Sequence, residues 1–249
     1  MSGIRMLPAG EQGLVVEFGQ TIDSAINNRV HQTAKLLNME IGDAIFEIVP
    51  TYRSLLVYFN PMRITRANLI RQIETMLKKT ENCLSEQDQK QIVMIPVCYG
   101  GDFGPDLDFV ARHNGLSPEE VIKIHTSDPY QVYMIGFTPG FPYLGGMSER
   151  IATPRLEKPR IKIPAGSVGI AGSQTGFYPM ESPGGWRLIG RTPIKAFNPQ
   201  ASNPFLFDAG QYLQFKAITE EEYHEINRKV DAGTYSPVTH IHVKGGGAI

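Results

Sequence analysis

Two folds are predicted within one chain: a two-layer α+β domain over residues 1–90 and an all-β domain over residues 91–235. Glycine and proline are unevenly distributed, because residues 1–95 hold only 5 of the 25 glycines and 3 of the 18 prolines. The second part is therefore rich in turns. There, short apolar runs alternate with Gly/Pro turns, whereas the first part alternates β-branched runs with helical periodicity. This contrast separates the two domains.

The first domain is predicted to have the order β-α-β-β-α-β, with the sheet in one layer and the helices in the other. Thr21 is the expected N-cap of the first helix, because apolar residues follow it at steps of four. Thr65 is expected to cap the second helix, and the polar residues 80–91 are expected to form a linker. The strands are expected at residues 13–18, 44–49, 55–59 and 92–98, and the helices at residues 21–37 and 65–77.

The second domain is predicted to open with two short helices and to continue as a barrel or a sandwich. Gly115 is expected to stop the first helix, and Ser117 is expected to cap the second, with Pro118 at its first position. From residue 131 onward, short strand-like runs with frequent turns and almost no helical periodicity indicate an all-β structure. The helices are expected at residues 106–113, after Ser117 and at 219–231, and a disordered tail is expected at 236–249.

Composition excludes several classes of protein. The formal net charge of −1 and a pI near 6.6 argue against a chain whose affinity for nucleic acid or a membrane surface depends on excess positive charge. No apolar run approaches the roughly 20 residues needed to span a bilayer, and the N-terminus lacks the pattern of a signal peptide. Cys83 and Cys98 are too few for a disulfide scaffold. We therefore expect a cytoplasmic protein with no nucleic-acid or membrane partner.

Several catalytic motifs are absent from the sequence. Neither a G-x-x-x-x-G-K-[ST] phosphate-binding loop nor an H-E-x-x-H zinc motif occurs, and the glycines of AGSVGIAG (residues 165–172) do not fit G-x-G-x-x-G. His240 and His242 are two potential ligands, but a metal site needs three or four fixed ones, so no metal is expected. His125, alone at a helix end, is expected to interact with the helix dipole.

Positive charge gathers in residues 131–200, which carry eight basic and three acidic residues, a net charge of +5. On a turn-rich β scaffold, such a concentration is what a binding site for an anion or a carboxylate requires. A solvated basic face is the alternative. Arg155 and Arg160 each follow a proline, which restricts where their guanidinium groups can go.

The same region contains an aromatic run, IGFTPGFPYLGG (residues 135–146). Phe137, Phe141 and Tyr143 are separated by prolines and a glycine, so the backbone is held rigid and the rings are expected to lie close together. A rigid aromatic patch can form a pocket wall or a partner surface. It can equally be a packed corner of the core, and both interpretations stay open.

Four runs carry a resemblance to a known family: VCYGGDFGPDL (97–107), GFTPGFPYLGG (136–146), PRLEKPRIKIPAGSVGIAGSQTGFYP (154–179) and SPGGWRLIGRTP (182–193). In this order they resemble the family of 5-oxoprolinase B subunits, also called allophanate hydrolase subunit 1, which includes the KipI inhibitor of a sporulation histidine kinase. The resemblance extends from residue 7 to about residue 215. It implies a cyclophilin-like β-barrel for the second domain and a small α+β domain for the first.

The resemblance also implies partners and a reaction. Together with 5-oxoprolinase subunits A and C, a B subunit of this family opens the lactam of 5-oxoproline to give L-glutamate, coupled to ATP hydrolysis; whether the B subunit itself contacts ATP is left open. Such a site needs positive groups around the developing oxyanion and an anchor for the substrate carboxylate. We expect the catalytic residues to be Arg155, Arg160, Lys162 and Arg191, and the substrate-binding residues to be Gln174, Thr175, Phe141, Tyr143 and Trp186.

A second function stays open beside the enzyme subunit. A KipI-like protein would inhibit a sensor histidine kinase by docking on its helical dimerisation domain through residues 137–144. No feature of the sequence separates the two. Prolyl isomerisation on the barrel is a third, weaker candidate, because a fold alone does not establish a function.

Overall fold

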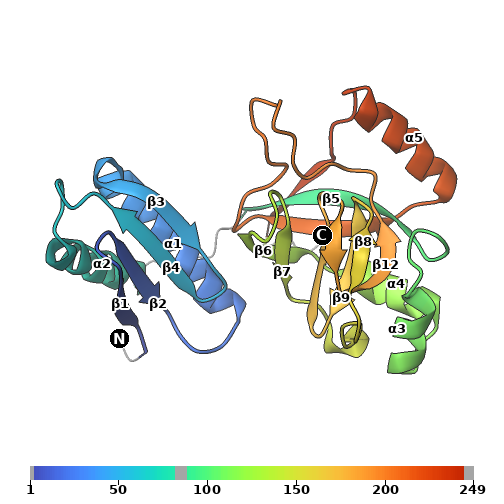
Figure 1. Ribbon diagram of the computed structural model, residues 1–249, viewed down its shortest axis with the longest axis horizontal. Coiled ribbons are helices and arrows are strands. Elements are labelled where there is room, and N and C mark those ends of the chain that lie inside the picture. Colours follow the sequence, from blue (N-terminus) through green and yellow to red (C-terminus); the bar gives the residue numbers. More distant parts are fainter. Residues whose placement is uncertain (1–2, 82–88, 244–249) are drawn as a thin grey trace, which may run out of the picture. The chain divides into compact units, whose positions relative to one another are not determined.

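The computed structural model describes residues 3–81 and 89–243 and divides into two compact units, Met1–Asp88 and Gln89–Ile249. The first unit contains a four-stranded antiparallel sheet of order β1-β2-β4-β3. Two helices that contact each other lie on this sheet (Figure 1). Its elements are β1 (Arg5–Ala9), β2 (Gly13–Glu17), α1 (Ser24–Ile41), the 3₁₀ turn η1 (Gly42–Ala44), β3 (Ile45–Pro50), β4 (Ser54–Phe59) and α2 (Arg66–Glu81).

The core of this unit forms where the apolar stripes of the two helices meet the sheet. Val30 and Leu37 of α1, and Leu69 and Ile73 of α2, are fully buried in one cluster with the strand residue Leu55. Apolar side chains at steps of three and four residues on a helix share one face, so each helix presents a continuous apolar stripe to the sheet. The predicted two-layer arrangement of strands and helices follows from this packing.

Three details of the first unit differ from the prediction. β1 was not expected, because its sequence RMLPA contains Pro8, and proline is tolerated only in an edge strand such as this one. The predicted strand 92–98 belongs to the second unit, so the order here is β-β-α-β-β-α. The cap of α1 is Asp23, which accepts a hydrogen bond from the Ile26 amide at 2.8 Å, and Thr21 instead donates to Asp23.

The predicted linker is shorter than expected. α2 continues to Glu81 and the next strand begins at Gln89, so both ends of the stretch 80–91 belong to regular elements. Residues 82–88 lie outside the described residues. Thr65 caps α2 as predicted, since the Asn68 amide donates to its hydroxyl at 3.3 Å.

The second unit is a nearly closed, barrel-like sheet with helices around it (Figure 1). The hydrogen-bonded order is β10-β9-β12-β5-β13-β6-β7, and β14 pairs with β5. Its elements are β5 (Gln89–Tyr99), α3 (Leu107–Asn114), α4 (Pro118–Ser127), β6 (Tyr130–Ile135), β7 (Pro142–Gly145), the 3₁₀ turn η2 (Glu149–Ile151), β8 (Arg160–Ile163), β9 (Ser167–Ala171), β10 (Gln174–Phe177), β11 (Ser182–Gly184), β12 (Arg187–Arg191), β13 (Tyr212–Ala217), α5 (Glu220–Asp231) and β14 (Thr239–Val243).

A glycine allows the two end strands of this order to approach each other. β7 and β10 contact each other without pairing, and a Cβ atom on Gly176 would lie 2.7 Å from the carbonyl oxygen of Pro142. That separation is shorter than any normal van der Waals contact, so only glycine fits at this position. The sheet thereby curls until its ends meet around a core that includes Val168 and Phe177.

Sequence signals at the helix ends of this unit are confirmed. Ser117 forms a capping box with Glu120 at the start of α4, and Thr219 forms another with Glu222 at the start of α5. Gly115 ends α3 in the left-handed conformation, with φ of 66°. None of the described helices is long and apolar enough to cross a membrane.

The tail prediction is wrong for part of its length. Residues Thr239–Val243 form β14, which pairs antiparallel with the first residues of β5. The last four residues of this strand, HIHV, alternate polar and apolar types, and the strand pairs with the edge of β5. Residues 244–249, the rest of the predicted tail, lie outside the described residues.

The close approach at Gly176 predicts that adding one methyl group there lowers the free energy of unfolding. We expect Gly176→Ala to destabilise the protein by about 2 kcal/mol, because the new Cβ must displace the β7 backbone. Gly185→Ala is the matched control, since its Cβ would lie no nearer than 3.7 Å to the closest atoms. Urea denaturation followed by far-UV circular dichroism measures both; equal stability of the two variants would contradict the proposed closure.

Candidate functional site

Four aromatic rings of the second unit pack into one cluster centred on Phe141. The ring centroid of Phe141 lies 5.1 Å from that of Tyr143 and 5.4 Å from those of Tyr178 and Trp186. The edge-to-face geometry of the contacts with Tyr178 and Trp186 is favourable for aromatic quadrupoles. Phe137 lies against the outer side of the cluster, 5.5 Å from Phe141. The predicted proximity of the rings in this run is confirmed.

The loop before β7 is held by two tight turns. Phe137 has φ of 63°, an uncommon conformation for a residue with a large side chain. The amide of Thr138 donates to the carbonyl two residues earlier at 2.7 Å, and the Phe141 amide donates to the Thr138 carbonyl at 3.0 Å. Pro139 and Gly140 occupy the centre of the second turn, where Gly140 supplies φ of 81°. These turns fix Phe137 in a largely exposed position.

Burial divides the cluster into a floor and an accessible edge. Phe141 and Trp186 are 2% and 6% exposed, so their rings form the buried floor rather than open walls. Burial also raises the pKa of Tyr178 to about 12. Tyr143 is only half-buried, and burial raises the pKa of its phenol while the charge of Arg155 opposes the rise. Tyr143 is therefore the phenol of this cluster that solvent reaches most readily.

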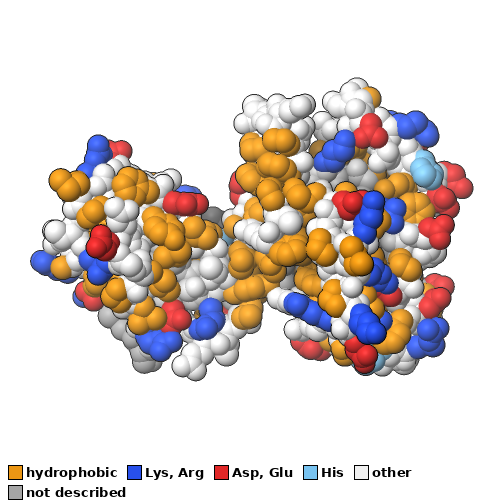
Figure 2. All heavy atoms as spheres, viewed as in Figure 1, with side chains coloured by type: hydrophobic (Ala, Val, Ile, Leu, Met, Phe, Trp, Pro, Cys, Tyr) orange, Lys and Arg blue, Asp and Glu red, His pale blue; other side chains and the backbone are white. Residues whose placement is uncertain are grey.

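Arg155 is the exposed cation beside this edge. Its charge acts on the phenols of both Tyr143 and Tyr178, which places the guanidinium near the two rings. Within residues 3–81 and 89–243, its side chain makes no hydrogen bond or ion pair. The backbone that carries it is anchored, because the amide of Leu156 donates to the Gly185 carbonyl at 2.7 Å. Figure 2 shows Lys and Arg side chains next to apolar ones over β8 and β12.

Arg160, also predicted as catalytic, is engaged in the structure. Its two terminal nitrogens lie 2.9 Å from the two carboxylate oxygens of Asp106, a bidentate ion pair. One of them also donates to the Trp186 carbonyl at 3.3 Å, and the Leu188 amide donates to Asp106 at 2.7 Å. The pair therefore joins β8 to the start of α3 and to β12. Its predicted catalytic role is untested.

The other two predicted cations point elsewhere. Lys162 pairs with Glu181 at 2.9 Å, and both side chains are mostly exposed. Arg191 donates to the Asp102 carbonyl at 3.3 Å and lies over the ring of Phe103. Among the described contacts, none joins Arg191 to the aromatic cluster. Of the four predicted catalytic residues, Arg155 and Arg160 lie near the cluster.

Thr175 and Gln174, predicted to orient a substrate, begin β10. Thr175 is fully buried, its hydroxyl donates to the Gly169 carbonyl at 3.0 Å, and it accepts from Nε2 of His125 at 2.8 Å. The hydroxyl is thus satisfied inside the core, away from solvent. Gln174 is half-buried and lies opposite Ala171 in the pairing of β10 with β9. Ala171 packs in the same apolar cluster as Phe141 and Trp186. Their substrate-binding roles stay predictions.

His125 is a core residue, and its prediction as a helix-dipole partner is wrong. Its Nδ1 accepts from the Tyr99 hydroxyl at 2.7 Å, its ring stacks on Phe215 at 4.5 Å, and it is fully buried. Because burial disfavours the charged ring, the pKa falls to about 3. A neutral imidazole cannot supply the positive charge that favours a helix C-terminus.

Two residues of this region escaped the sequence analysis. Tyr178 was not singled out, although it follows a strand-like run, and Asp106 was expected only as the start of a helix. Asp106 does precede α3, but its side chain makes no capping hydrogen bond and turns to Arg160. Asp106 lies 54 residues before Arg160 in the chain, so no local pattern marked this pair.

Comparisons with known proteins establish the family. Residues 4–207 match the family described as the carboxyltransferase domain, subdomain C and D. The chain is 46% identical over 223 residues to the B subunit of 5-oxoprolinase from Bacillus subtilis (strain 168), covering 86% of this chain and 93% of that protein. This chain belongs to the family of 5-oxoprolinase B subunits.

Solved structures that are similar to this chain support the fold described above. The crystal structure of the conserved uncharacterized protein PH0987 from Pyrococcus horikoshii is 47% identical, with a TM-score of 0.52, covering 88% of this chain and all of that one. The K. lactis urea amidolyase is 21% identical with a TM-score of 0.75, covering 96% of this chain and 16% of that one. The second likeness is one of fold alone.

The two neighbouring cations of β8 give a matched test of the ion pair. We expect Arg160→Gln to destabilise this family member by about 2 kcal/mol, because it leaves the largely buried Asp106 carboxylate without its cation. Lys162→Gln removes only an exposed pair and should change stability by less than about 0.5 kcal/mol. Urea denaturation measures both, and equal effects would show that Asp106 does not depend on Arg160.

Buried His125 predicts a loss of stability in acid. The pKa of the ring is near 6.5 in the unfolded chain and about 3 in the folded protein. Below pH 6.5 the ring is therefore protonated in the unfolded chain but stays neutral in the folded protein, which favours unfolding. Between pH 7 and pH 5 this linkage alone removes about 2 kcal/mol of stability. His125→Gln should be less stable at pH 7 but lose correspondingly less over that interval; identical pH slopes would contradict a neutral buried ring.

Proposed function

We propose that this chain is the B subunit of an ATP-dependent 5-oxoprolinase, which hydrolyses 5-oxo-L-proline to L-glutamate together with subunits A and C. The observation that carries the proposal is its 46% identity to the B subunit of the B. subtilis 5-oxoprolinase over nearly the whole of that protein. The name of that relative implies further subunits, so the chain is proposed to act within a complex. We further propose that its barrel has the cyclophilin-like arrangement that this family implies.

The reaction adds water across the lactam C–N bond. The hydroxyl goes to the carbonyl carbon, which becomes the side-chain carboxylate of glutamate, and the ring nitrogen takes the proton and leaves as the amine. Negative charge develops on the carbonyl oxygen, and the substrate already carries one carboxylate. A cation held beside an apolar surface is suited to either negative group, since a low-polarity surrounding strengthens its attraction.

Arg155 is the cation best placed for this role. Arg160 is engaged with Asp106, Lys162 with Glu181, and Arg191 lies against Phe103, whereas Arg155 is exposed beside Tyr143. We propose that Arg155 binds the substrate carboxylate or the developing oxyanion. The half-buried Tyr143 phenol would provide a neighbouring hydrogen-bond donor, because a phenol is protonated at neutral pH and burial raises its pKa further.

In the proposed complex, ATP would supply the free energy for opening the lactam, because activation of the amide oxygen makes the carbonyl carbon easier to attack. The glycine-rich residues 165–172 do not fit the phosphates, because most of them form strand β9, whose backbone groups pair with β10 and β12. A phosphate-binding loop instead keeps its amides free and points them at the ligand. We therefore propose that another subunit of the complex holds the nucleotide.

The inhibitor of a sensor histidine kinase is not favoured by these observations. The family description and the names of the relatives given above refer to carboxyltransferase, oxoprolinase and urea amidolyase. The exposed Phe137 remains compatible with contact to another protein, and a partner subunit of the oxoprolinase is the simpler candidate. The prediction of a kinase partner therefore stays a prediction.

The proposed site is tested in the assembled complex. The chain is co-expressed with subunits A and C, and ATP-dependent release of glutamate from 5-oxo-L-proline is measured. Arg155→Gln should lower kcat/KM by about a hundredfold, because one charge-assisted contact to the reacting molecule is lost. Lys158→Gln, an exposed cation in the same loop, should leave it within about twofold.

Two results would overturn separate parts of this proposal. Unchanged turnover in Arg155→Gln would show that the site lies elsewhere, while leaving the reaction intact. No release of glutamate from the complete wild-type complex would show that the substrate is another compound. Circular dichroism of the variant complex controls for folding, which we expect to be unaffected because the Arg155 side chain has no described hydrogen bond.

A further inference from the structure

The four-stranded sheet of the first unit is covered by helices on one side only. Leu14 and Val16 of β2 and Val57 of β4 are buried in one cluster with side chains of both α1 and α2. Successive residues of a strand point to opposite faces, so the residues between these point to the other side of the sheet. The described elements of the first unit leave that second face uncovered.

A row of apolar side chains crosses the uncovered face. Leu7 of β1 lies opposite Val15 of β2, which in turn lies opposite Leu56 of β4. Leu56 lies opposite Val49 of β3, and Tyr58 follows on β4 with 40% of its surface exposed. Leu7 is 41% exposed, and the other three residues of the row are half-buried without packing against the core cluster. The open face of an antiparallel sheet is usually polar, so this row is unusual.

Charged residues lie at both ends of the row. Arg5 and Glu17, opposite each other on β1 and β2, form an ion pair at one end. At the other end, the exposed Glu47 lies opposite Tyr58. An apolar centre with a polar rim is the arrangement found in protein–protein interfaces, and contiguous exposed apolar patches mark such contacts.

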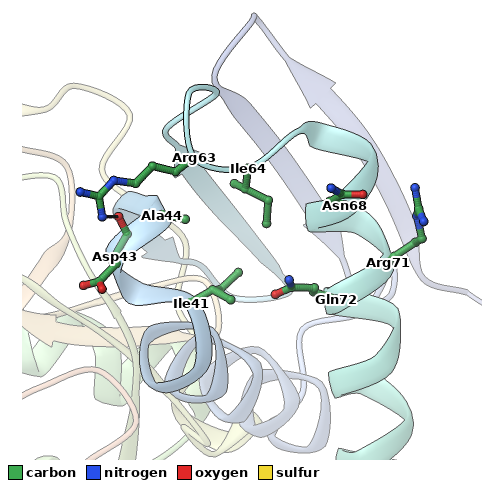
Figure 3. Close-up of a pocket in the computed structure, with 8 residues that line it drawn as sticks. All are labelled: Ile41, Asp43, Ala44, Arg63, Ile64, Asn68, Arg71 and Gln72. Carbon is green, nitrogen blue, oxygen red and sulfur yellow. Dashed lines mark hydrogen bonds between the residues drawn. The ribbon is translucent and has the colours of Figure 1, made fainter.

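The helix side of the same unit has the character of an ordinary solvated surface. Arg71, Gln72 and Lys78 of α2 are exposed there. Figure 3 shows Arg63 and Arg71 pointing outward at opposite ends of the hollow between the end of α1 and the start of α2. Met39 of α1 is 71% exposed, and single apolar side chains of this kind are normal on a protein surface. The contrast makes the sheet face the candidate contact surface.

The size of the sheet face indicates what covers it. Four strands about 4.8 Å apart, each contributing about five residues at about 3.4 Å, span roughly 330 Å². A stable interface usually buries about 800 Å² on each partner, so two copies joined through this face alone would fall short. A partner that also binds elsewhere on the chain needs only part of its affinity from this face.

A solved relative shows that these units occur as part of a larger protein. TTHA0988 is 34% identical to this chain with a TM-score of 0.72, and the match covers 83% of this chain but only 40% of that one. The larger part of that protein is therefore further polypeptide attached to the matching region. For a chain of 249 residues, a separate subunit is the counterpart of such a region.

We propose that the uncovered sheet face, defined by Leu7, Val15, Leu56, Val49 and Tyr58, docks an apolar surface of another subunit of the complex. The inference rests on the proposed function, which supplies the complex, and adds the surface through which this chain joins it. Leu7 and Tyr58 gain the most burial on docking, because they are the most exposed residues of the face.

Co-purification of defined subunits tests this surface. The chain carries an affinity tag and is co-expressed with subunits A and C, and the amount of each subunit recovered per tagged chain is measured. Leu7→Lys and Tyr58→Lys should each lower the recovery of at least one subunit by about fivefold or more, because the ammonium group loses water in an apolar contact. Lysine is well tolerated in an edge strand such as β1, so Leu7→Lys should fold normally.

Two matched variants control for the substitution itself. Met39→Lys makes the same change on the helix side of the unit, and Tyr58→Phe keeps the ring; both should recover the subunits as the unchanged chain does. Far-UV circular dichroism and urea denaturation of each purified variant check that the first unit is folded.

Several outcomes would overturn the inference. It is wrong if neither subunit co-purifies with the unchanged chain, if both Lys variants of the sheet face retain full recovery, or if Met39→Lys loses the subunits equally. It is also wrong if the chain alone forms a dimer in light scattering that Leu7→Lys and Tyr58→Lys abolish, because a second copy then occupies the face. Glutamate release from the same preparations separates the two proposals: an assembled but inactive complex overturns only the proposed reaction, and an active complex that keeps its subunits in both Lys variants overturns only the docking surface.

Discussion

The Asp106 carboxylate is the point at which three elements of the barrel unit are joined. It accepts two hydrogen bonds from Arg160 on β8 and one from the Leu188 amide on β12, and it precedes α3. A carboxylate that is only 8% exposed needs such partners, because an unpaired buried charge is very costly. The contact of Arg160 with the Trp186 carbonyl extends this network to the aromatic cluster. The position of Arg155, carried between η2 and β8, depends on the same anchoring.

Close approach of backbone and rings provides the second constraint. Gly176 admits the Pro142 carbonyl, and a Cβ on Gly184 would lie 2.4 Å from the Tyr178 hydroxyl. Small residues therefore stand where the aromatic side chains and the neighbouring strand need space. The result is a rigid surface beside which Arg155 has no described partner, whereas Arg160 and Lys162 are paired. A freely available charge on a fixed surface is what a site for an anionic substrate needs.

Local signals predicted much of the fold, and contacts between distant segments explain the rest. The caps at Thr65 and Ser117 were predictable because a helix end is specified by residues within one turn. β14 and the placement of residues 92–98 were not, because their strand pairing depends on partners far along the chain. β1 pairs with the next strand and was missed because it contains Pro8. In the site, the proximity of Phe137, Phe141 and Tyr143 followed from their spacing. The pairing of Arg160 with Asp106, 54 residues away, had no local signal.

The pairing of β5 has a consequence for how the barrel unit is made. β5 is the first strand of that unit, yet it pairs in parallel with β13 and antiparallel with β14, whose residues follow more than a hundred positions later. Contacts of such sequence separation are slow to form, because a long loop must close first. During synthesis on the ribosome, the apolar residues of β5 therefore stay without these two strand partners until β13 and β14 have emerged. The first unit, whose contacts are all nearer in sequence, can fold meanwhile.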